Sequence, residues 1–134
     1  MAVGLGVAAE LISPKEYDDL LHKRELFVQK LRTKLDFIKV NFENSPRLPN
    51  TASICFTGFD AGLILQNLEG KIEASRSAAC HSGTGTSNVL VKSGLSLADA
   101  ASTIRFSVGR NTTDEEIEKA SECIFDAISK IKQS

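Results

Sequence analysis

Two long segments of the chain carry apolar residues at helical spacing. Residues 13–35 begin with Ser13, which can cap a helix, Pro14 at the first helical position and Glu16 to complete a capping box. Residues 113–134 begin with a second capping box, Thr113 and Glu116. Both segments are predicted to form amphipathic helices with one apolar face for a core. The apolar positions are Tyr17, Leu20, Leu21, Phe27, Val28, Leu31 and Leu35 in the first segment and Ile117, Ala120, Ile124, Ile128 and Ile131 in the second.

Between these helices the pattern changes to the alternation of strands. Residues 51–58 and 103–109 alternate apolar and polar positions, and weaker extended runs cover 37–42 and 71–75. Short helices are predicted near 60–70, 87–94 and 96–102. The order predicts an α+β fold, a two-layer sandwich of a small mixed or antiparallel sheet with two long amphipathic helices.

Composition narrows the class of protein further. The chain has 134 residues, 42% hydrophobic and 25% charged, with a net charge of -1, which suits one domain with a core. The basic residues are scattered, the apolar runs are short, and the first residues lack a basic region. Nucleic-acid binding, a membrane span and a secretory signal are therefore not expected. Three cysteines without a CxxC pair favour a reducing compartment, and the expected localisation is cytoplasmic.

The segment 77–87, "SAACHSGTGTS", places Cys80 among small residues that give a thiol no packing role. Three interpretations compete: a reactive nucleophile, a metal ligand, or an ordinary turn residue. The metal reading is the weaker one, because His81 is adjacent and no spaced ligands follow. Cys55 on a strand and Cys123 on the closing helix are expected to be structural thiols that burial makes inert.

Arg105 lies in the middle of the alternating run 103–109, on its polar side. An arginine there is most often a solvated residue, whereas the functional interpretation is bidentate binding of a carboxylate. Arg110, beside the turn at Gly109, is expected to be a surface charge or a loop cap.

Three segments together resemble a known family: "RLPNTASICFTG", "SRSAACHSGTGTSNVLVKSGLS" and "STIRFSVGRNTTDEEIEKA". They are similar, in this order, to the C-terminal portion of the cysteine desulfurase and selenocysteine lyase family, pyridoxal-phosphate enzymes of the class V aminotransferase group. The segment "VGLGVAAELI" resembles the family's helix between its large and small domains. The resemblance therefore implies a remnant of this helix at residues 1–12 and a small C-terminal domain at residues 13–134.

The same resemblance implies roles for individual residues. It places the family's catalytic cysteine at Cys80 and its substrate-carboxylate arginine at Arg105, for release of sulfur or selenium from cysteine or selenocysteine with formation of alanine. The "ACHS" form at residues 79–82 leans toward selenocysteine lyase, with His81 as a residue that tunes the thiol. It also implies a homodimeric full-length enzyme and a sulfur or selenium acceptor protein. One departure is Arg76-Ser77, where relatives usually carry a glycine.

The cofactor side of this family is not matched by the chain. Its Schiff-base lysine follows a histidine and precedes glycine and proline, whereas the one His-Lys pair here, His22-Lys23, lies inside the first predicted helix. No pyridoxal phosphate is therefore expected on this chain alone, which we expect to be inactive by itself. The alternatives are a stand-alone persulfide carrier or regulatory binding module around Cys80, and a plain structural domain that self-associates through its apolar first residues.

Overall fold

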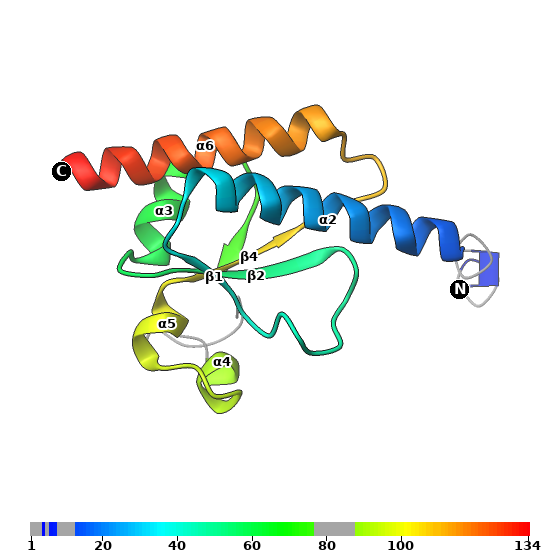
Figure 1. Cartoon of the computed structure of the whole chain (residues 1–134), viewed down its shortest axis with the longest axis horizontal. Coiled ribbons are helices and arrows are strands. Elements are labelled where there is room, and N and C mark those ends of the chain that lie inside the picture. Colours follow the sequence, from blue (N-terminus) through cyan, green and yellow to red (C-terminus); the bar gives the residue numbers. More distant parts are fainter. Residues whose placement is uncertain (1–3, 5, 8–12, 77–87) are drawn as a thin grey trace.

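The protein is described by a computed structural model that covers residues 4, 6–7, 13–76 and 88–134. Two long helices, α2 (Pro14–Lys34) and α6 (Asp114–Gln133), lie side by side over one face of a sheet. The shorter helix α3 (Ala61–Leu68) lies on the same side and contacts α6 (Figure 1). Two short helices, α4 (Asn88–Lys92) and α5 (Leu97–Ala101), lie on the other side of the sheet (Figure 1).

The sheet has four antiparallel strands in the order β1-β2-β4-β3. The strands are β1 (Ile38–Val40), β2 (Thr51–Phe56), β3 (Ser75–Arg76) and β4 (Thr103–Ser107). The α+β sandwich predicted from the sequence is therefore confirmed, and its sheet is antiparallel. The predicted strand at 71–75 was largely wrong, because residues 71–74 lie outside the ladder and only Ser75 and Arg76 pair with β4.

The core lies between the sheet and the long helices. The even-numbered residues of β2 and β4 point into it, so that Ile54 lies opposite Ile104 and Ala52 opposite Phe106. The Phe27 ring from α2 packs on Phe106 with ring centroids 5.2 Å apart. This alternation leaves the odd-numbered positions of the same strands to the opposite face, where the polar side chains gather.

Both long helices begin at the capping residues predicted from the sequence, with one difference in the hydrogen bonds. Thr113 and Glu116 form both hydrogen bonds of a capping box on α6. At α2 the Ser13 hydroxyl accepts from the Glu16 amide, but the Glu16 carboxylate instead pairs with Arg110 at 2.8 Å. That ion pair joins the start of α2 to the β4–α6 connection and explains the position of Arg110.

Two positions of α2 depart from the predicted apolar face. Tyr17 is 51% exposed, whereas Arg24 is buried with only 5% exposure. Burial of Arg24 is tolerated because its guanidinium donates to the Leu48 carbonyl at 2.9 Å and pairs with Glu25 at 2.6 Å. The periodicity could not show this, since the partner Leu48 lies in the loop before β2.

Candidate functional site

The sheet face opposite the core carries Arg105 at its centre. Arg105 is the middle residue of β4, and its side chain is exposed while both of its neighbours in the strand are buried. On the adjacent strands Ser53 of β2 and Ser75 of β3 lie directly opposite it in register. Because paired residues point to the same face, the guanidinium is flanked by a serine hydroxyl on each side.

Arg105 has no acidic partner among residues 13–75 and 89–134, whereas Arg24, Arg32, Arg47 and Arg110 each pair with a glutamate. A guanidinium presents five N–H donors in a planar fork that matches a carboxylate. The geometry of this face therefore suits binding of a small anion better than it suits a structural ion pair.

A chain of polar contacts lies beside Arg105 on the same face. The Asn41 amide nitrogen lies 3.1 Å from both the Ser53 hydroxyl and the Thr103 hydroxyl. Thr103 in turn donates to the Asp99 carbonyl of α5 at 2.7 Å. This network ties β1, β2, β4 and α5 together next to the arginine.

Cys55 ends the polar side of β2 under α5 and is fully buried. Burial is the main cause that raises the pKa of its thiol, and the nearby Asp99 carboxylate, 3.6 Å from Sγ, raises it further. The predicted burial of Cys55 is thus confirmed, and its low reactivity stays a prediction. Cys123 is partly buried and packs against the core.

Cys80 and His81 lie outside the described residues, as does the segment 1–12 apart from Gly4, Gly6 and Val7. Their predicted roles therefore stay predictions. The structure does place the start of their segment, because β3 ends at Arg76, which pairs with Ile104 beside Arg105. Cys80 follows Arg76 by four residues in the sequence.

The His22-Lys23 pair lies on α2, as predicted. His22 is exposed, but the Lys23 side chain is only 12% exposed and pairs with Asp19 at 2.9 Å. Lys23 also donates to the Arg110 carbonyl at 2.7 Å. A lysine held in this way joins two segments of the fold and is not free to form a Schiff base.

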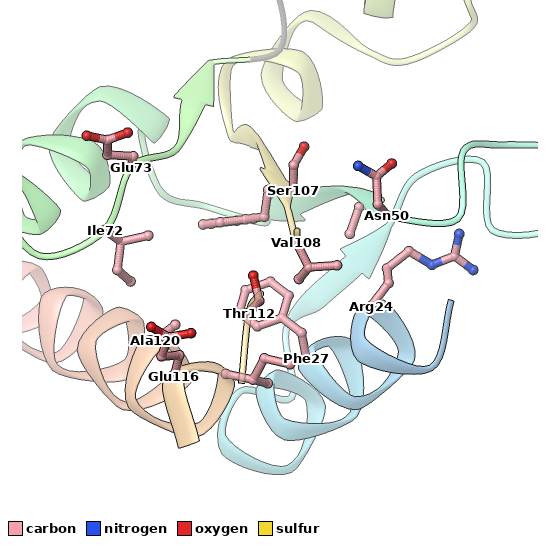
Figure 2. Close-up of a pocket in the computed structure, with 13 residues that line it drawn as sticks. Arg24, Phe27, Asn50, Ile72, Glu73, Ser107, Val108, Thr112, Glu116 and Ala120 are labelled. Carbon is pink, nitrogen blue, oxygen red and sulfur yellow. The ribbon is translucent and has the colours of Figure 1, made fainter. Parts of the chain in front are cut away.

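A small pocket lies away from Arg105, where the chain before β3 diverges from β4 (Figure 2). It has a volume of about 90 Å³, with Phe27, Phe106 and Ile117 as its apolar floor. Ile72 and Glu73 face Val108 and Thr112 across it in Figure 2. No cysteine is among the described residues that line this pocket, so it is not a candidate for thiol chemistry.

Filling this pocket is expected to stabilise the fold. Ala120 of α6 lines the pocket and is partly buried, and Ala120→Leu adds apolar volume while replacing one favourable helix residue with another. We expect a gain of about 1 kcal/mol in the free energy of unfolding, measured by urea denaturation. Lys119→Leu, one position along the same helix, is the control; an equal gain there would show that the pocket is not the cause.

Two features do not occur in the described part of the chain. No group of three or more His, Cys, Asp and Glu side chains there could hold a metal ion. No helix among the same residues is both long and apolar enough to cross a membrane.

The fold is that of a mixed α+β domain, and the comparisons with known proteins place it in the class V aminotransferase group. The chain superposes on the X-ray structure of a NifS-like protein from Rickettsia africae with a TM-score of 0.73 and 26% identity, over 87% of this chain and 30% of that one. A second NifS-like protein has the same fold, with a TM-score of 0.68 at 21% identity over 84% of this chain and 28% of that one.

Curated relatives name the family. The chain is 29% identical to the cysteine desulfurase IscS of Rickettsia akari, over 99% of this chain and 33% of the relative. It is 32% identical to the mitochondrial cysteine desulfurase of Arabidopsis thaliana, over 98% of this chain and 30% of the relative. No family model matches the chain. The chain is a homologue of the cysteine desulfurases and corresponds to their C-terminal part, and it spans about a third of the length of the curated relatives it matches.

Sequence reasoning identified Arg105 but missed its neighbours Ser53, Ser75 and Asn41. A signal for Ser53 was present, because the alternation of residues 51–58 already places it on the non-core face. Asn41 carried no such signal, since its contact with Ser53 depends on the pairing of β1 with β2.

Proposed function

We propose that this chain supplies two functional groups of a cysteine desulfurase or selenocysteine lyase: the Cys80 thiol as nucleophile and Arg105 as the ligand of the substrate carboxylate. One observation carries the proposal. An exposed arginine without an acidic partner in the described residues lies between two serines, one on each adjacent strand. One of these strands, β3, leads directly into the Cys80 segment. A carboxylate held at Arg105 would thus be near the nucleophile, which is what such a reaction needs.

Cysteine desulfurases are pyridoxal-phosphate enzymes, and the cofactor supplies electron withdrawal that labilises the bonds of a bound amino acid. The His22-Lys23 pair does not fit this group, because Lys23 is already bound to Asp19 and the Arg110 carbonyl. In this proposal the cofactor is held by residues outside the chain, as are the second subunit and the acceptor protein. Residues 13–134 act as one domain that brings the thiol and the arginine to it.

Sulfur transfer tests both residues without the cofactor. The Cys80 thiolate attacks the outer sulfur of a persulfide donor R–S–SH, which forms Cys80–S–SH and releases R–S⁻. With cysteine persulfide as donor, we expect transfer about tenfold faster than with its methyl ester, because only the acid offers a carboxylate to Arg105. Arg105→Ala should remove this preference and Arg105→Lys should keep part of it. Mass analysis of the peptides after tryptic digestion locates the added sulfur.

Each outcome separates the candidate functions. Sulfur on Cys80 with no preference between acid and ester would overturn the role of Arg105 and favour a persulfide carrier. Sulfur on Cys55 or Cys123 in place of Cys80 would overturn the nucleophile assignment. Alanine release from L-cysteine or L-selenocysteine with added pyridoxal phosphate is expected to stay at the free-cofactor background. A rate above it that is lost in Cys80→Ala would contradict the absence of a cofactor site, and its substrate preference would test the lean toward selenocysteine.

A further inference from the structure

The two serines beside Arg105 look equivalent in sequence but differ in their contacts. Both lie opposite Arg105 in register, Ser53 on β2 and Ser75 on β3, and both are partly buried. The Ser53 hydroxyl is 3.1 Å from the Asn41 amide nitrogen, and no such contact reaches the Ser75 hydroxyl from the described residues. Within the described residues, therefore, a neighbouring side chain holds the Ser53 hydroxyl but not the Ser75 hydroxyl.

The direction of hydrogen bonding at Ser53 follows from the hydrogen bond between Thr103 and Asp99 at the other end of the network. The Thr103 proton is donated to the Asp99 carbonyl at 2.7 Å, so that Thr103 must accept its other bond. The group of Asn41 that faces Thr103 is hence the NH₂ donor and not the carbonyl oxygen. The second hydrogen of that NH₂ is then donated to Ser53, which leaves the Ser53 proton free to be donated elsewhere.

We propose that Ser53 is a further binding residue, which donates its hydroxyl proton to the carboxylate held by Arg105, and that Asn41 is the residue that positions it. This inference rests on the proposed function of Arg105. Its physical basis is that a carboxylate oxygen accepts several hydrogen bonds, and that a donor fixed beforehand loses little entropy on binding. The arrangement favours a planar carboxylate, which meets the arginine fork and the serine donor at once.

Acetate is the probe for this site. It is titrated into the full chain, with chloride used to keep the ionic strength constant, and binding is followed by the NMR shifts of the backbone amides of β2 and β4. Ser53→Ala is expected to weaken acetate binding about tenfold, as for loss of one hydrogen bond to a charged group. Ser53→Thr keeps the hydroxyl and should bind close to the original. Ser75→Ala is the matched control on the other flank of Arg105, with an expected change below about twofold.

The role of Asn41 is tested by a double-mutant cycle. Asn41→Ala should weaken acetate binding about threefold in the original chain but hardly at all in the Ser53→Ala background, because it acts through that hydroxyl. An equal effect in both backgrounds would assign Asn41 to general structure and overturn its positioning role.

Different results would overturn the proposed function of Arg105 and the proposed role of Ser53. If Arg105→Ala binds acetate as the original chain does, or if the original chain binds none, the function proposed for Arg105 fails and this inference with it. If Arg105→Ala abolishes binding while Ser53→Ala behaves like Ser75→Ala, only the role of Ser53 is overturned.

Discussion

Ile104→Ala is expected to lower the free energy of unfolding by about 4 kcal/mol, a large fraction of the stability that a domain of this size commonly has. Ile104 is fully buried in β4, opposite Ile54 in register and facing the long helices. Removing three carbon atoms there leaves a cavity that the two-layer core cannot close. Urea denaturation at neutral pH measures the loss, and Ile104→Val should lose about 1 kcal/mol only.

The control is the next residue along the same strand. Arg105→Ala changes an exposed side chain on the opposite face and should alter the free energy of unfolding by less than about 0.5 kcal/mol. A loss as large as that of Ile104→Ala would mean that Arg105 holds the fold together, and would remove the reason to assign it to ligand binding.

Cys55 is expected to react with iodoacetamide at least about 100-fold more slowly than Cys80 at pH 8. Its thiol is fully buried, and its raised pKa leaves less thiolate at any given pH. Alkylation therefore has to wait for local opening of β2 and α5. Digestion and mass analysis over time give the rate at each cysteine. Comparable rates at Cys55 and Cys80 would contradict the burial of Cys55 or the reactivity of Cys80, and a Cys80→Ser variant separates the two.

The same raised pKa has a consequence for stability. The folded state favours the protonated thiol of Cys55, so that this contribution is present below the ordinary cysteine pKa of about 8.5 and is lost as pH rises through the higher folded value. The original chain should thus lose more stability between pH 8 and 10 than Cys55→Ala does.

The elements of this fold were largely predictable because their signals are local. Capping residues mark the starts of α2 and α6, and alternation distinguishes the two faces of β2 and β4. The errors come from contacts between distant segments. Tyr17 occupies an apolar position of the pattern but has little to pack against, whereas Arg24 is buried because the loop at Leu48 supplies an acceptor.

The candidate site shows the same limit. The position of Arg105 on the polar face follows from alternation alone. Its proposed role in binding a carboxylate follows from the family resemblance. The environment of Arg105 depends on the strand order β1-β2-β4-β3, which brings residues 41, 53, 75 and 105 to one face. That order is set by packing of the whole domain, and no short segment of the sequence contains it.

The two-residue strand β3 has a consequence for reaction rate. It pins the chain at Arg76, one pair from Arg105, and only four peptide units separate this point from Cys80. In the function proposed above, a thiol on so short a tether meets a carboxylate bound at Arg105 at an effective concentration of millimolar order or more, whatever its concentration in bulk. Inserting glycines between β3 and Cys80 is then expected to dilute the thiol around the arginine without changing either residue, and so to lower the rate of sulfur transfer.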